Sequence, residues 1–233
     1  MKGHFYLKPL LVGMLFVAAC YNDEPFENPL DPASPDYIQP LTADKGMMID
    51  DFNDGKQINL LGLPHSIFKS PITIRTIDTF YINQPSKNVL RGTGGALRME
   101  IDVTTPDSAF GGWLTTLSDA QGVPLNLKLL NLHALTFWVK ADTTTIKLEV
   151  ALIDSTPRCD KGCQTDDKVR YEIKTFWQKV KIPISTLSRH KEVGSLDSTR
   201  IREINFAFGH KNIGSIGQRS KVTVYLDEIA FER

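Results

Sequence analysis

The cysteines are the residues of this chain whose surroundings point most directly to chemistry. Cys20 follows a positively charged start and an apolar run from Leu10 to Ala19, and the residues immediately before it are small. This order is typical of a secretory signal, and the run is too short to span a bilayer. A buried helix that ends in a cysteine by chance is the alternative. The pattern predicts a protein that works outside the cytoplasm.

The four residues Val17-Ala18-Ala19-Cys20 resemble the lipobox of bacterial lipoproteins. The resemblance implies that residues 1–19 are a signal peptide and that the Cys20 thiol receives a diacylglycerol. Each buried acyl methylene contributes ~0.8 kcal/mol, so several acyl chains hold a domain to a bilayer durably. Tyr21, in place of Asp after the cysteine, favours the outer membrane by the same resemblance. We expect a lipid-anchored protein of the cell envelope that faces the periplasm or the cell surface.

Residues 20–46 have a composition of their own and form the expected linker. After Cys20, five prolines and six acidic residues stand against a single base, Lys45. Prolines stiffen a chain toward polyproline II, and like charges keep it extended. This composition predicts a semi-rigid stalk, and an irregular segment lying against the domain is the alternative.

The remaining cysteines, Cys159 and Cys163, lie close together in the sequence. Outside the cytoplasm such a pair most often forms a disulfide. On the chain-entropy estimate, a bridge closing so short a loop contributes roughly 2 kcal/mol before strain. A zinc site is the alternative, but no second Cys/His pair has ligand spacing.

Residues 47–233 suit a single domain in which apolar and polar residues alternate along many short segments. The alternation is clearest over residues 97–103, 135–140, 146–152, 179–182, 203–208 and 222–226. In the last segment the apolar positions shift by one residue at Asp227-Glu228, which predicts a β-bulge. Many antiparallel strands in one domain predict an all-β fold, namely a two-sheet antiparallel β-sandwich. A closed barrel is the alternative.

The order of several motifs along residues 47–233 resembles that of the galactose-binding-like jelly rolls. These motifs are DDFNDG at 50–55, FGGW at 110–113, LTFWVKAD at 135–142, FWQKVKIPIS at 176–185 and VYLDEIAF at 224–231. Within that group, the chain resembles the family-eleven carbohydrate-binding modules and the complex I intermediate-associated protein domain. The resemblance implies a jelly roll that binds a polysaccharide or oligosaccharide without catalysis, although such folds host many functions.

The resemblance also implies a calcium site. In such modules, acidic residues of the first and last strands often share a structural calcium ion, and Asp50, Asp51 and Asp227 match those positions. Calcium takes oxygen ligands from carboxylates, carbonyls and water, which a bulged backbone could offer. The alternative is that these carboxylates cap turns or face water. The string is not an EF-hand, because Phe52 and Leu61 stand where oxygen ligands are needed.

Sugar sites combine an apolar ring face with planar polar groups, so residues on the polar faces of the strands are the candidates. The predicted carbohydrate-binding residues are Trp138, Arg98, Glu100, Asp102, Lys140, Glu149 and Asn205. If their strands share one sheet, these side chains line one open face. Trp138 is the main candidate for stacking, and a Trp packed under a loop or under the N-terminal segment is the alternative. We expect Trp113 and Trp177 to be structural.

Other chemistry finds little support. Glu100 and Glu149 have the residue type of a glycosidase acid/base pair, but cross-strand ion pairs with Arg98 and Lys147 are the simpler interpretation. The formal net charge is +0 and there is no basic block, so nucleic acid is not an expected partner. The sequence predicts a non-catalytic glycan-binding lipoprotein. The alternatives are a structural module that docks other envelope proteins and a glycoside hydrolase.

Overall fold

The computed structural model describes residues 44–54, 56–70, 73–81, 89–90, 94–102, 110–118, 122–142, 146–155, 169–187, 189–190, 194–209 and 221–233. The predicted signal peptide, the lipid-acceptor Cys20, most of the linker and the predicted Cys159–Cys163 disulfide lie outside these residues and stay predictions. Within the described part of the chain, no helix is long and apolar enough to cross a membrane.

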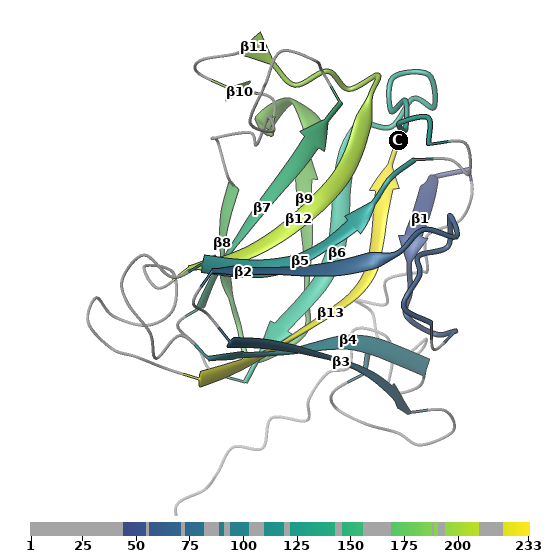
Figure 1. The fold of residues 1–233 in the computed structure, drawn as a ribbon. Coiled ribbons are helices and arrows are strands. Elements are labelled where there is room, and N and C mark those ends of the chain that lie inside the picture. Colours follow the sequence, from purple (N-terminus) through teal and green to yellow (C-terminus); the bar gives the residue numbers. More distant parts are fainter. Residues whose placement is uncertain are drawn as a thin grey trace, which may run out of the picture. The chain divides into compact units, whose positions relative to one another are not determined.

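All described strands except β10 and β11 form two antiparallel sheets that pack face to face (Figure 1). Sheet I has the strand order β3-β4-β13-β6-β9, and β1 pairs with β13 beyond the end of β4. Its strands are β1 (Gly46–Asp50), β3 (Thr73–Tyr81), β4 (Gly94–Asp102), β6 (Ala134–Ala141), β9 (Gln178–Pro183) and β13 (Lys221–Glu232).

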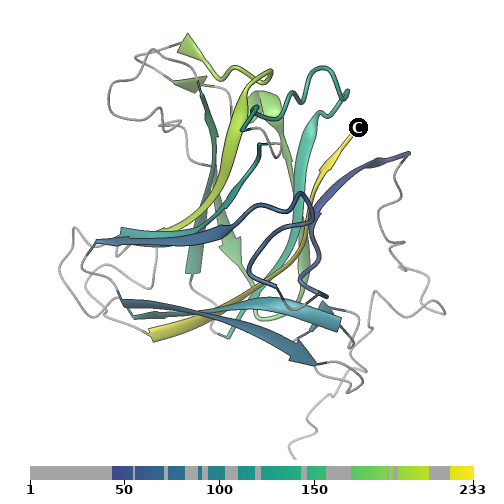
Figure 2. The same ribbon diagram turned by 45° about the vertical axis from the view of Figure 1, so that its right-hand side comes forward.

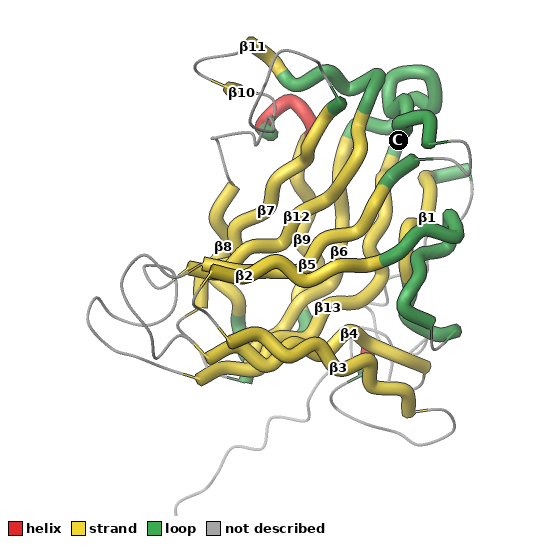
Figure 3. The backbone as a smooth tube through the Cα atoms, in the orientation of Figure 1, coloured by secondary structure: helices red, strands yellow, loops and turns green. Residues whose placement is uncertain are grey.

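Sheet II has the strand order β2-β5-β12-β7-β8. Its strands are β2 (His65–Ser70), β5 (Phe110–Thr116), β7 (Ile146–Asp154), β8 (Val169–Ile173) and β12 (Ile201–Gly209). A short helical turn η2 (Ile184–Thr186) follows β9, and β10 (Arg189–His190) pairs with β11 (Gly194–Ser195). Figure 3 shows that strands make up both layers. The two-sheet sandwich confirms the predicted all-β fold.

Figure 2 shows the two sheets from a second side. The buried hydrophobic side chains of both sheets form the core. Phe137 of β6 meets Phe206 of β12 edge to face, with ring centroids 5.0 Å apart, and Phe206 lies 5.7 Å from the ring of Trp113 on β5. All three side chains are buried. Such aromatic pairs add to the stabilisation from buried area. Trp113 is therefore structural, as predicted.

The predicted β-bulge in β13 is confirmed. The register between β13 and β6 shifts between Asp227 and Ala230, and Glu228 has a φ of 44°. Before the bulge the even-numbered residues face the core, and after it Ile229 and Phe231 do so. The extra residue thus keeps both halves of this long strand in register with one hydrophobic core.

Candidate functional site

The predicted carbohydrate-binding residues lie on the two opposite outer faces of the sandwich. One group belongs to sheet I: Trp138, Lys140, Arg98, Glu100 and Asp102. The other group belongs to sheet II: Glu149 and Asn205. The strands therefore do not share one sheet, and the structure does not bring these residues together. The side chain of Asp102 is not among those that the structure describes.

On the outer face of sheet I, the side chains of Trp138 and Lys140 are buried by neighbouring residues. Trp138 is only 3% exposed, although its neighbours in sequence on β6 fill the core from the other side. The Nζ of Lys140 lies 5.6 Å from the ring centroid of Trp177 and 5.0 Å from that of Tyr225. Trp177 and Tyr225 are buried as well, so these cation–π contacts belong to a packed cluster. The Trp138 ring leaves little surface for a sugar.

The acidic residues of the predicted set form separate ion pairs. The Nη2 of Arg98 lies 2.6 Å from Oε1 of Glu100 within β4. The Nε of Arg170 on β8 donates to Oε1 of Glu149 on β7, at 2.9 Å. Glu100 and Glu149 lie on opposite outer faces, so they cannot flank one glycosidic bond as an acid/base pair.

The outer face of sheet II has a floor of small residues with larger groups on both sides. One row of register partners crosses all of its strands: Phe68, Gly112, Ala207, Glu149 and Arg170. An aromatic ring thus stands at one end of the row and an ion pair at the other. We call the outward-facing side chains of β2, β5, β12, β7 and β8 the sheet II face.

Gly112 allows Phe68 to lie close to the strand beneath it. A Cβ at Gly112 would meet the backbone oxygen of Phe206 at 2.0 Å and Cζ of Phe68 at 2.8 Å. Real Cβ atoms do not approach other atoms so closely, so this position requires glycine. The missing side chain lowers the floor of the sheet II face beside the Phe68 ring.

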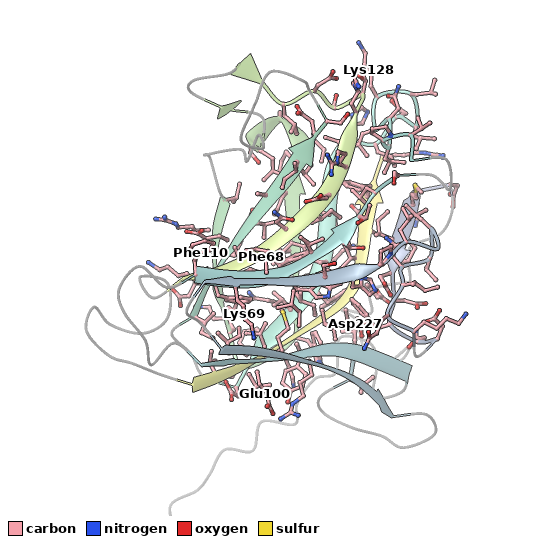
Figure 4. All side chains as sticks on the ribbon, in the orientation of Figure 1. Phe68, Lys69, Glu100, Phe110, Lys128 and Asp227 are labelled. Atoms are coloured by element: carbon pink, nitrogen blue, oxygen red, sulfur yellow. The ribbon has the colours of Figure 1, made fainter. Side chains whose placement is uncertain are left out.

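Phe110 adds a second ring to the same end of this face. It is 51% exposed and stands two residues before Gly112 on β5, so both point to the same side of the sheet. Figure 4 shows Phe68 and Phe110 near each other at this end of β2 and β5. Exposed aromatic rings suit the apolar faces of sugar rings, because both are flat and poorly hydrated.

Asn205 lies on the outward side of sheet II but is buried there, with an unsatisfied amide oxygen. In register it lies between Leu114 of β5 and Ala151 of β7. Its side chain is 6% exposed, and its Oδ1 has no hydrogen-bond partner among the described residues. A buried unpaired amide oxygen costs about 1–3 kcal/mol. This oxygen has almost no accessible surface, so in this structure it is closed to a ligand hydroxyl.

The acidic residues of the predicted calcium site have other partners in the structure. Asp50 accepts a hydrogen bond from the Phe52 amide at 2.8 Å, and its Oδ2 lies 2.9 Å from Nε2 of His65. Asp227 accepts from the Glu228 amide at 2.8 Å. Among the described residues, no group of three acidic, His or Cys side chains could hold a metal ion. These contacts do not test a calcium site that would also use backbone carbonyls and water, so calcium binding by Asp50, Asp51 and Asp227 stays a prediction of the sequence.

Sequence reasoning missed Phe68, Phe110, Gly112 and Arg170. The FGGW motif at 110–113 held a usable signal, because a buried Trp113 places Phe110 and Gly112 on the opposite, outward side. No comparable signal marked Phe68 or Arg170. Their place at the two ends of one row follows from strand pairing between distant segments.

A family profile described as Carbohydrate binding domain 30 matches residues 70–233 of the chain. The match covers more than half of the chain and includes every strand of sheet II except β2. The search of curated proteins gave no match.

Several solved structures have a similar fold. The family 11 carbohydrate-binding module of the cellulosomal cellulase Lic26A-Cel5E of Clostridium thermocellum has a TM-score of 0.53 at 15% identity, covering 80% of this chain and 94% of that one. The family 11 module from the same organism, solved with a β-1,3-1,4-mixed-linked tetrasaccharide, has a TM-score of 0.54 at 15% identity, covering 80% and 95%. A family 30 module has a TM-score of 0.50 at 17% identity, covering 71% and 90%. At these identities the likeness establishes the fold alone.

Proposed function

The chain belongs to the family of carbohydrate binding domain 30, and we propose that it binds a polysaccharide or oligosaccharide on the sheet II face without cleaving it. The observation that carries the choice of face is the row from Phe68 to Arg170. It combines aromatic rings, the small residues Gly112 and Ala207 and charged groups on adjacent strands. The outer face of sheet I lacks an open ring among its described tryptophans, because Trp138 and Trp177 are buried there.

The ligand class follows from what the face offers. Phe68 and Phe110 provide apolar surface for pyranose rings, while the exposed Arg170 provides a polar group for hydroxyls. A face that runs across five strands suits an extended chain of several sugars better than a single sugar. The tetrasaccharide in the family 11 complex makes mixed-linkage β-glucan the first ligand to test.

Isothermal titration calorimetry of the purified chain against β-glucans, xylan and mannan tests the proposal. Phe110→Ala is expected to weaken binding by roughly 1–3 kcal/mol, by analogy with stacking of other flat rings on aromatic side chains. Phe176→Ala is the matched control, because Phe176 is similarly exposed, at 53%, but lies between β8 and β9. Absence of heat with every glycan contradicts the proposed function, and equal affinity of both variants contradicts the proposed face. Release of reducing sugar would contradict the absence of catalysis.

Membrane attachment is the second part of the proposal. The apolar run that ends at Cys20 supports a lipid anchor that holds the domain in the cell envelope. Mass spectrometry of the N-terminal peptide from the membrane fraction should find Cys20 acylated as the first residue. Cys20→Ser should abolish the acylation, and an unmodified Cys20 in the wild-type chain would contradict the anchor.

A further inference from the structure

The connection between β5 and β6 presents exposed apolar side chains to the surroundings. Leu129 is 79% exposed, Val123 57% and Leu130 40%. Leu129 is the most exposed large apolar side chain among the described residues. Exposed apolar surface of this kind marks interaction sites when it is contiguous, and the adjacent Leu129 and Leu130 make this connection a candidate contact site.

The turn around Leu129 is held in place by its own hydrogen bonds. The amide of Leu129 donates to Oδ1 of Asn126 at 2.8 Å, and the amide of Leu130 donates to the Asn126 carbonyl at 3.2 Å. On either side, Leu127 and Leu132 are buried in the core, and the Leu132 amide donates to the Leu127 carbonyl at 2.9 Å. The structure thus projects the two exposed leucines outward from a fixed base. We call residues 126–131 the leucine turn.

The leucine turn lies at the end of the domain where the described chain begins. The amide of His133, two residues after the turn, donates to the Glu232 carbonyl at 2.8 Å. Arg233, the residue after Glu232, donates from its amide to the Lys45 carbonyl at 2.9 Å and from its Nη1 to the Asp44 carbonyl at 2.8 Å. Figures 1 and 2 both show this connection beside the C-terminus.

The exposed side chains around the leucine turn carry mostly positive charge. Lys128 is exposed within the turn itself, and Figure 4 shows it at the outer end of the molecule. Lys45 and Arg233 are exposed beside it, with Asp44 as an exposed acid. Glu232 is also near, but its carboxylate is paired with two lysines of β9. Lysine and arginine near an apolar tip are the combination that binds anionic lipid headgroups.

We propose that the leucine turn rests on the lipid surface to which the chain is anchored, with Leu129 and Leu130 at the headgroup–acyl boundary. The inference rests on the proposed anchor at Cys20. The chain from Cys20 to Asp44 can span up to roughly 80 Å, so the anchor alone does not determine which end of the domain faces the bilayer. Contact through the leucine turn fixes which end faces the bilayer. The sheet II face, on the side of the sandwich, then stays open to glycans.

The test places a fluorescent reporter at the leucine turn. Full-length acylated chain carrying Leu129→Trp is reconstituted in vesicles of phosphatidylcholine and phosphatidylglycerol, with or without brominated acyl chains. The native Trp113, Trp138 and Trp177 are buried, so they contribute a constant background. We expect the variant to lose fluorescence in brominated vesicles. Phe176→Trp is the control, because Phe176 lies near the far end of β6, where the Lys174 carbonyl accepts from the Ala141 amide, and this variant should keep its fluorescence.

The outcomes separate the inference from the proposed anchor. If Cys20 is acylated and the Leu129→Trp variant is not quenched, the leucine turn does not contact lipid and the inference is wrong. If Cys20 is not acylated, the double variant Cys20→Ser, Leu129→Trp is added to the same vesicles. Quenching there supports lipid contact without the anchor, and its absence overturns it. A change of oligomeric state on Leu129→Asp, with no quenching of the Leu129→Trp variant, would assign the turn to contact between protein copies instead.

Discussion

Asp50 and His65 join the two sheets through a buried contact. Asp50 ends β1 of sheet I, His65 begins β2 of sheet II, and Oδ2 of Asp50 lies 2.9 Å from Nε2 of His65. The two side chains are 3% and 7% exposed. The His65 ring also packs 4.7 Å from the Trp113 ring and 5.9 Å from that of Phe52. This polar contact therefore sits inside an aromatic cluster.

Breaking the contact between Asp50 and His65 should destabilise the sandwich. We expect Asp50→Ala to lower the free energy of unfolding by about 1–3 kcal/mol, because it removes the acceptor of the Phe52 amide and the carboxylate that lies against His65. Asp51→Ala is the control, since the bond that the Asp51 carboxylate accepts, from the Asn53 amide, is local and exposed. Urea denaturation measures both. Equal losses in the two variants would contradict the special role of the buried pair.

Gly112 should be intolerant of even the smallest side chain. Because a Cβ there would lie 2.0 Å from a backbone oxygen of β12, Gly112→Ala forces the two strands apart. We expect a loss of about 1–3 kcal/mol in unfolding free energy, as for overpacked cores, together with weaker glycan binding. Gly62→Ala is the control. Gly62 has a φ of 81° but open space around it, so only backbone strain of about 1 kcal/mol is expected. The proposed steric conflict fails if Gly112→Ala is no worse than this.

A substitution at Trp138 tests which of the two outer faces binds the glycan. Because it is buried on the outer face of sheet I, Trp138→Phe should lower stability by about 1–3 kcal/mol and leave glycan affinity unchanged. Thermal melting and calorimetry on the same sample measure the two effects. A folded Trp138→Phe variant with weakened glycan binding would move the site to sheet I, in agreement with the expectation from the sequence.

The fold could be predicted from the sequence because the alternation of apolar and polar residues determines which side chains enter the core. Alternation along 97–103, 135–140 and 203–208 places every second side chain in the core, and these segments became β4, β6 and β12. The phase change at Asp227-Glu228 predicted the bulge for the same reason. Alternation also indicated the correct outward side for Trp138 and Asn205.

The sequence could not predict which outward side chains share a face. Alternation tells whether a residue points toward or away from the core, but the assignment of a strand to sheet I or sheet II depends on pairing between distant segments. Trp138 and Asn205 therefore looked equivalent, although they lie on opposite sides of the sandwich. The sequence also could not predict that side chains on the outer face of sheet I are buried. Lys140 is covered by Trp177, which comes from the connection between β8 and β9.

The ion pairs of Glu232 make the free energy of unfolding fall at acid pH. Its Oε1 and Oε2 accept hydrogen bonds from the ammonium groups of Lys179 and Lys181, at 2.7 and 2.8 Å. Burial alone would raise the pKa of the Glu232 carboxyl, but the two lysines outweigh it and hold that pKa below its usual range. Because the pKa is lower in the folded state, the ionised group stabilises the fold above the unfolded pKa of about 4.3. This contribution is lost as the pH falls through the folded pKa.

The pH dependence can be isolated with Glu232→Gln. The variant should be less stable than wild type near neutral pH by up to about 1 kcal/mol, a small value because Lys181 is largely exposed. The difference should shrink as the pH falls below about 4, where the wild-type carboxylate gains its proton. Urea denaturation of both proteins at neutral pH and in acid measures it. Glu203→Gln is the control, because Glu203 pairs with the adjacent and exposed Arg202 at 3.3 Å. A difference between wild type and Glu232→Gln that persists unchanged in acid would show that the lost packing of the side chain, and not its charge, accounts for the effect.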